Sequence, residues 1–135
     1  MPLIIVPEKV KTLKNLVDPE ALVDLLQQTE EQGQVVVHVF CPPQPDEFAI
    51  RVWRTTYLVS RTSSHKSRLI HAENISIAPR WTEAKANHPY SFTLIFEALP
   101  KDVLLFDLAE IIPQPGGFYY SSILRNDKDV YEIRL

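Results

Sequence analysis

Glycine and cysteine are both scarce in this sequence, and each scarcity excludes a class of site. Three glycines in 135 residues leave no glycine-rich loop of the kind that cradles phosphate in P-loop and dinucleotide-binding proteins. Cys41 is the only cysteine, which excludes an intramolecular disulfide and a zinc site built on cysteine pairs. Ser63 and Ser64 lack the flanking glycines of a hydrolase nucleophile elbow. No cofactor or metal is therefore expected from a motif.

Long apolar runs and an excess of basic charge are also missing. No stretch approaches the ~20 apolar residues that a membrane-spanning helix needs, and the apolar run near the N-terminus is too short for a signal peptide. We therefore expect a cytoplasmic protein that has no membrane partner. The formal net charge of −3 gives no general attraction to phosphate backbones, so nucleic acid is not an expected partner either.

Proline, in contrast, is abundant, with 11 residues. Proline breaks helices and occurs at strand edges and in connections, so its abundance predicts many short elements. The length fits one domain with one core, and 45% hydrophobic residues is an ordinary value for a globular chain. We therefore expect residues 1–135 to form a single domain.

One amphipathic helix is predicted, over residues 18–32. Asp18 is a candidate N-cap, Pro19 would occupy the first helical position, and Gly33 follows the last turn. The apolar run at residues 3–6, between two prolines, indicates a short strand. Residues 1–33 are thus expected to form a strand-plus-helix extension that packs on the rest of the domain.

From residue 34 onward the pattern is that of short strands. A β-branched run covers residues 35–40, and residues 92–97 alternate between apolar and polar faces. We expect one strand over residues 48–59 with a bulge near Arg54, and a hairpin in which LPKD, residues 99–102, joins two strands. Seven or eight short strands with regular turns predict a mainly β fold, an antiparallel β-sandwich of immunoglobulin-like or jelly-roll-like type. The expected core consists of Val35 to Phe40, Ile50, Val52, Phe92, Leu94, Phe96, Leu104, Phe106 and Leu108.

Part of this pattern resembles a known kind of protein. The run FTLIFEALPKDVLLFDLAE, residues 92–110, followed by the closing strand VYEIRL, residues 130–135, is similar to uncharacterised bacterial β-sandwich proteins. The resemblance covers about a third of the chain and implies a fold but no function. No functional residue is transferred from it.

The stretch from residue 61 to residue 75 contains the main candidates for a ligand site. The candidate ligand-binding residues are Arg61, His65, Lys66, Arg68, His71 and Glu73. Guanidinium and ammonium donors that converge could bind a carboxylate or phosphate, although a solvated connection between strands has the same composition. His71 and Glu73 are two residues apart, so in a strand they point to one face and could share a proton, or a metal with a further ligand.

Aromatic residues form a second candidate surface. Trp81, Phe118, Tyr119 and Tyr120 would suit protein or carbohydrate binding if they are exposed, or would close the ends of the fold if they are buried.

The remaining reactive groups are expected to be structural. His38 is interpreted as a strand histidine on the less buried face, and Cys41 as a small buried hydrophobe. Asp107 and Glu110 are an odd number of residues apart, so they should lie on opposite faces of a strand and do not form an acid pair.

Because no catalytic constellation is present, the first functional hypothesis is a non-enzymatic module that binds another protein or a second copy of itself. Edge strands of a β fold expose backbone groups that can pair with such a partner. One alternative is a small ligand-binding protein or enzyme that uses the region from His65 to Glu73 for an anion or a metal. Another alternative is a structural subunit of a larger assembly.

Overall fold

The computed structural model describes residues 33–135, and within this range the fold is mainly β. Ten strands and no helix occur in these residues, which confirms the predicted class. The strands are β1 (Val35–Cys41), β2 (Phe48–Val52), β3 (Thr56–Ser60), β4 (Lys66–Glu73), β5 (Ser76–Ile77), β6 (Thr82–Ala84), β7 (Tyr90–Phe96), β8 (Leu105–Glu110), β9 (Tyr119–Leu124) and β10 (Val130–Arg134). The predicted strand at 3–6 and helix at 18–32 lie outside the described residues.

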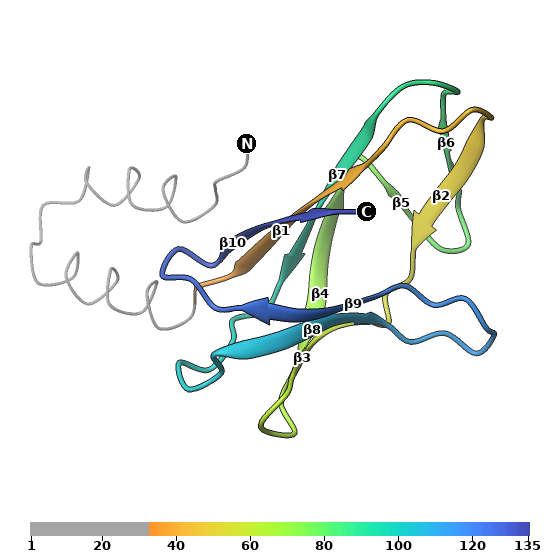
Figure 1. Cartoon of the computed structure of the whole chain (residues 1–135). Coiled ribbons are helices and arrows are strands. Elements are labelled where there is room, and N and C mark those ends of the chain that lie inside the picture. Colours follow the sequence, from red (N-terminus) through yellow and green to blue (C-terminus); the bar gives the residue numbers. More distant parts are fainter. Residues whose placement is uncertain (1–32) are drawn as a thin grey trace, which may run out of the picture.

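Seven of the strands form one sheet that curls into a half-barrel (Figure 1). Their order is β10-β1-β7-β4-β3-β8-β9, and all neighbours are antiparallel except β1 and β10, which are parallel. The curl brings strands from near opposite ends of this order together, since the rings of Phe106 on β8 and Tyr131 on β10 meet edge to face at 5.2 Å. A second sheet of three short strands has the order β5-β2-β6.

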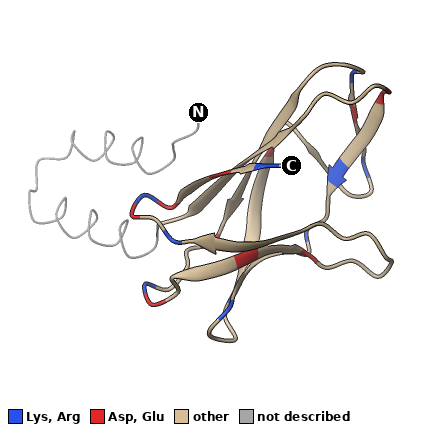
Figure 2. Cartoon of the chain, viewed as in Figure 1, with Lys and Arg blue, Asp and Glu red and all other residues tan. Residues whose placement is uncertain are grey.

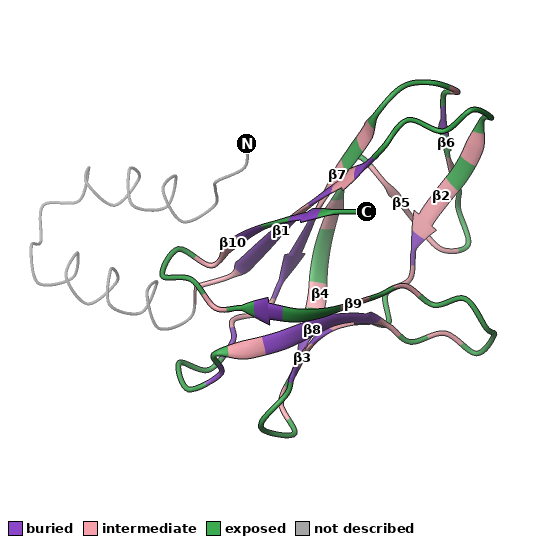
Figure 3. Ribbon diagram, in the orientation of Figure 1, coloured by how far each residue is buried: buried purple, intermediate pink, exposed green. Residues whose placement is uncertain are grey.

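The concave side of the seven-stranded sheet contains the core. Three valines of β1, at positions 35, 37 and 39, point into the core. Leu58, Phe96, Phe106 and Ile133 from four other strands are fully or almost fully buried with them. Buried residues are concentrated in the large sheet, whereas β2, β5 and β6 are mostly half-buried or exposed (Figure 3). The small sheet therefore extends the domain without a core of comparable size.

The predicted antiparallel sandwich is not confirmed. Only three strands lie outside the curled sheet, and one pair in each sheet, β1 with β10 and β2 with β5, is parallel. The alternation of apolar and polar residues reports that a strand has one buried face. It does not report whether that face meets a second sheet or the other end of its own curled sheet.

The single strand expected over residues 48–59 is a wrong prediction. The chain leaves β2 after Val52, turns at residues 53–55 and enters β3 in the other sheet. The Thr56 hydroxyl donates to the carbonyl of Trp53 at 2.7 Å, and a Glu110 carboxylate oxygen accepts the Trp53 N–H at 3.0 Å. The change of apolar face near Arg54 therefore marks a change of sheet, not a bulge.

The predicted LPKD hairpin is wrong as well. In the strand order β7 and β8 are separated by β4 and β3, so the connection crosses the end of two strands instead of making a tight turn. Leu104, expected in the core, is 63% exposed because it precedes the first residue of β8, at the open end of the sheet.

Arg125 ties this connection to the loop between β9 and β10. Its guanidinium donates to the carbonyl oxygens of Leu99, Pro100 and Val103 and forms a two-point ion pair with Asp129. One side chain thereby satisfies backbone acceptors that no strand partner reaches. Arg125 therefore holds the β7–β8 connection and the β9–β10 loop together.

Candidate functional site

A β-bulge in β4 sets the position of the predicted His71 and Glu73 pair. Leu69 pairs with Phe96 and His71 with Ile95, so Ile70 is the extra residue on β4. Beyond the bulge His71 and Glu73 point to the same side, as the sequence predicted, with 3.6 Å between Nε2 and Oε1. Both side chains are more than half exposed. The pair is therefore accessible from solvent.

The four other candidates from this stretch do not join the pair, because each has a partner of its own. Arg61 is 3.3 Å from an Asp107 carboxylate oxygen, and Lys66 lies 5.1 Å from the centre of the Tyr57 ring. Arg68 forms a two-point ion pair with Glu97, with a shortest distance of 2.8 Å, and His65 Nε2 lies 2.8 Å from the Ser67 hydroxyl. The predicted anion-binding cluster of Arg61, His65, Lys66 and Arg68 is thus distributed over four separate contacts.

The contacts of Arg68 favour the ionised form of Glu97. Hydrogen bonds from the guanidinium and the backbone N–H of Arg68 hold the pKa of Glu97 below its usual range. Arg68 and Glu97 also exchange a backbone contact, since the Glu97 N–H donates to the Arg68 carbonyl at 2.9 Å. Arg68 therefore extends the pairing of β4 with the end of β7 and is not a free cation.

A groove beside β4 is lined by residues that the sequence pattern did not place together. It has a volume of about 850 Å3, within the range of ligand-binding hollows. Its lining comes from the turn between β2 and β3, from the second half of β4, and from the segment that runs through β5 into the following turn. It consists of Arg54, Ile70, His71, Ala72, Ile75, Ser76, Ile77, Ala78, Pro79 and Arg80. The bulged Ile70 and the predicted His71 thus belong to one surface with two arginines that were not predicted.

The basic side chains give this groove its electrostatic character. Arg54 and Arg80 are exposed, and neither forms an ion pair with a carboxylate among residues 33–135. Each is adjacent in the sequence to a tryptophan, Trp53 and Trp81, which is the one signal that could have marked them. In most of the domain, charged residues of both signs lie in loops and near strand ends (Figure 2).

Arginine and tryptophan also stack next to the groove. The Arg51 guanidinium lies 3.9 Å from the centre of the Trp81 ring and 5.3 Å from that of Trp53, and it donates to the carbonyl of Pro79 at 3.0 Å. Pro79 is part of the groove lining. Trp81 remains 56% exposed in this stack. An aromatic surface therefore borders the basic groove.

The other predicted aromatic residues have different surroundings. Phe118 and Tyr120, which flank Tyr119 in the sequence, pack against the core. Tyr119 itself, the first residue of β9, is 60% exposed. The Tyr119 hydroxyl donates to the carboxylate of Asp107, which raises the pKa of that phenol. Of the four predicted aromatic residues, only Trp81 and Tyr119 thus present most of their surface to solvent.

Asp107 and Glu110 of β8 both accept hydrogen bonds from backbone N–H groups. Asp107 is buried, which by itself raises its pKa, but hydrogen bonds from Tyr119, the Ser122 N–H and Arg61 together hold the pKa below its usual range. Glu110 accepts the backbone N–H groups of Trp53 and Phe118. The two carboxylates thus accept hydrogen bonds from different groups.

His38 and Cys41 on β1 have equally local surroundings. His38 Nδ1 lies 2.8 Å from the Thr93 hydroxyl on the neighbouring strand, in the half-buried position that the sequence suggested. Cys41 is buried, and burial raises the pKa of its thiol. A raised pKa lowers the thiolate fraction, which is the nucleophilic form.

Residues 33–135 contain neither a metal-binding cluster nor a membrane-spanning helix, and no similar protein assigns a function to the chain. Within residues 33–135 no group of three or more His, Cys, Asp and Glu side chains is arranged to hold a metal ion. The same residues contain no helix that is long and apolar enough to cross a membrane. The chain matches no protein-family model, no curated protein and no solved structure.

Proposed function

We propose that this domain is a non-enzymatic binding module that holds an acidic segment of a partner protein in the groove between β4 and β5. The observation that carries the proposal is the pair of arginines at the groove, Arg54 and Arg80, which have no ion-pair partner among the described residues. A guanidinium is always charged and binds carboxylates with two parallel hydrogen bonds.

The shape and composition of the groove favour a chain segment over a single small anion. Isoleucine and alanine side chains contribute apolar surface between the basic groups, so a ligand that alternates apolar and acidic residues would satisfy both. Arginine and tryptophan, which stack beside the groove in Arg51 and Trp81, are the residue types most enriched at the energetic centres of protein interfaces.

Catalysis has less support. The carboxylates of Asp107 and Glu110 and the ring of His38 each have a hydrogen-bond partner within the fold, and the thiol of Cys41 is buried. The alternative of a small-anion site uses the same groove, because His71 lines it with the two arginines. One experiment can compare the two ligand classes.

The test is fluorescence anisotropy with a labelled twelve-residue peptide in which glutamate alternates with valine. A matched peptide with lysine in place of glutamate is the charge control, and inorganic phosphate is the small-anion competitor. We expect the acidic peptide to bind, the basic peptide to bind at least tenfold more weakly, and the affinity to fall as salt screens the exposed charges.

Two variants locate the binding. The double substitution Arg54→Gln with Arg80→Gln should weaken binding of the acidic peptide about tenfold or more, because each removes a charge-assisted contact. Arg68→Gln is the matched control, since Arg68 is already paired with Glu97, and it should leave the affinity within about twofold.

Several outcomes would contradict the proposal. Equal binding of acidic and basic peptides, or binding that survives the double substitution, would exclude the groove as an acid-binding site. Displacement of the peptide by millimolar phosphate would support the small-anion alternative. Sedimentation of a stable dimer that dissociates in the double variant would identify the partner as a second copy of this chain.

A further inference from the structure

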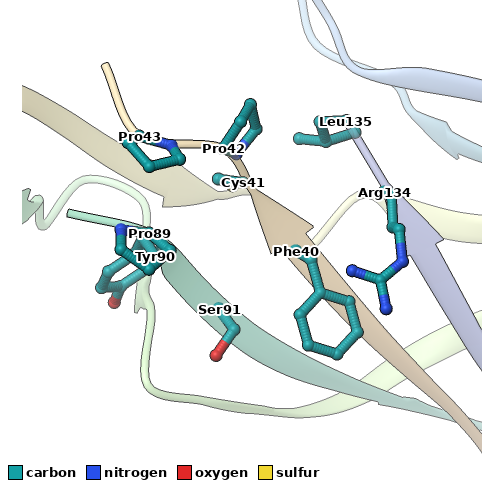
Figure 4. Close-up of a pocket in the computed structure, with 9 residues that line it drawn as sticks. All are labelled: Phe40, Cys41, Pro42, Pro43, Pro89, Tyr90, Ser91, Arg134 and Leu135. Carbon is teal, nitrogen blue, oxygen red and sulfur yellow. The ribbon is translucent and has the colours of Figure 1, made fainter. Parts of the chain in front are cut away.

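A second hollow lies at the opposite strand ends from the Arg125 contacts, where β1 and β10 finish and β7 begins (Figure 4). Its volume is about 530 Å3, again in the range of small-molecule sites. The residues that line it are Phe40, Cys41, Pro42, Pro43, Pro89, Tyr90, Ser91, Arg134 and Leu135. Three prolines, two aromatic rings, a leucine and a buried thiol make this lining predominantly apolar.

The hollow has a preformed backbone. Cys41 pairs with Tyr90 at the last rung of the β1 and β7 ladder, and the Leu135 N–H donates to the Phe40 carbonyl at 2.9 Å. The prolines have fixed φ angles, which removes part of the conformational entropy that a loop would lose on binding. A ligand would therefore meet walls that are already in place.

Arg134 is the one ionised side chain in this lining. Its guanidinium carbon lies 4.7 Å from the centre of the Phe40 ring, and Figure 4 shows the two side chains next to each other. It forms no ion pair with a carboxylate among residues 33–135. Stacking on Phe40 restrains the guanidinium at the border of the apolar surface while its N–H donors remain available.

The other polar side chains of the hollow are neutral. The Tyr90 hydroxyl donates to the carbonyl of Asn74, and burial raises the pKa of both Tyr90 and Cys41, so neither carries a negative charge near pH 7. Among the side chains of the hollow, one positive charge thus lies beside an apolar wall. No acidic side chain lines it.

We propose that this hollow binds a small amphiphilic carboxylate, with the acid group on Arg134 and the hydrocarbon against Phe40 and the neighbouring prolines. The complementary ligand is a monocarboxylic acid with a medium-length chain, because its single charge and its apolar body match the lining. This site is separate from the groove between β4 and β5, and it does not depend on the function proposed for that groove.

The probe is octanoate, with 1-octanol and octylammonium as ligands of the same length that are neutral and oppositely charged. Binding to the full chain is followed by the chemical shifts of backbone amides in two-dimensional NMR. We expect octanoate to shift the amides of Phe40, Ser91 and Arg134. 1-Octanol should bind at the same place about tenfold more weakly, and octylammonium should be weaker still.

The substitution Arg134→Gln removes the charge and keeps much of the side chain. It should reduce octanoate affinity about tenfold and leave the affinity for 1-octanol unchanged, which also demonstrates that the variant hollow is intact. Arg68→Gln is the matched control and should change neither affinity.

The proposal is wrong if octanoate at millimolar concentration leaves these three amides unshifted. It is equally wrong if the shifts map to another part of the domain, or if Arg134→Gln binds octanoate as tightly as the original chain does. None of these results bears on the acidic-peptide experiment, so the two proposals fail separately.

Discussion

Asp107 accepts the backbone N–H of Ser122 at 2.8 Å, and this contact occupies the bulge of the edge strand β9. Phe106 pairs with Ile123 and Leu108 with Tyr120, so β9 has one residue more than β8 between these pairs. Ser122 has a positive φ of 63°, a conformation that non-glycine residues rarely adopt. A buried carboxylate thus stabilises an irregular backbone at the edge of the sheet.

The first prediction concerns this carboxylate. Asp107→Asn should lower the free energy of unfolding by about 2 kcal/mol, because it removes the charge from hydrogen bonds to Arg61, Tyr119 and Ser122. Urea denaturation at neutral pH measures the change. Asp102→Asn, in an exposed turn, is the control and should change the stability by less than about 0.5 kcal/mol.

The pH dependence of stability should follow from the same residue. The pKa of Asp107 is lower in the folded chain than the value of about 3.9 expected when unfolded, so the unfolded state binds the proton more readily. Its contribution is fully present above the unfolded pKa and is lost as the pH falls through the folded pKa. Asp107→Asn should therefore flatten the stability profile below about pH 5, and an unchanged profile would contradict this role.

The third prediction concerns Arg125, which connects two loops. Arg125→Lys keeps the charge but cannot reach three carbonyls and both oxygens of Asp129 at once, so we expect a loss of about 2 kcal/mol in unfolding free energy. Arg54→Lys, at an exposed site that forms no ion pair with residues 33–135, should be close to neutral. If both substitutions have the same effect in thermal denaturation, the proposed link between the loops is not important for stability.

Gly117 gives the fourth prediction. A Cβ added to Gly117 would collide with the backbone carbonyl oxygen of Glu110, and backbone cannot move aside as a side chain would. Gly117→Ala should therefore destabilise the domain by about 1–3 kcal/mol, the usual range for overpacking. Gln114→Ala in the same loop is exposed and serves as the control. Equal stabilities of the two variants would show that the loop shifts freely.

The fifth prediction concerns the thiol. Cys41 is 7% exposed and has a raised pKa, so alkylation by iodoacetamide at pH 8 should be much slower in the folded chain than in the same chain unfolded in urea. Mass spectrometry of timed samples measures the two rates. Rapid alkylation of the folded chain would mean that the strand end around Cys41 opens readily.

Local sequence patterns predicted the positions of strands well where apolar residues dominate. The β-branched run at residues 35–40 became β1, with its valines in the core, and the alternation at residues 92–96 became part of β7. The spacing of His71 and Glu73 also predicted correctly that they share a face. Side-chain direction in a strand has a period of two residues, so these features depend only on neighbours in the chain.

Local sequence patterns did not predict which strands pair with each other. The strands on either side of LPKD resemble a hairpin, yet β4 and β3 lie between them, and the apparent bulge at Arg54 is a change of sheet. Alternation defines the faces of a strand but contains no information about which edge it pairs with. That choice depends on the total burial that the curled sheet achieves.

The sequence by itself therefore determined the class of the fold and the faces of its strands, because both follow from the order of apolar and polar residues along the chain. Only the tertiary structure decided which basic residues have partners. It paired Arg61 with Asp107 and Arg68 with Glu97, and it brought Arg54, His71 and Arg80 to one groove. Charges far apart in sequence meet only after the chain has folded, since an ion pair requires contact in space and leaves no local pattern.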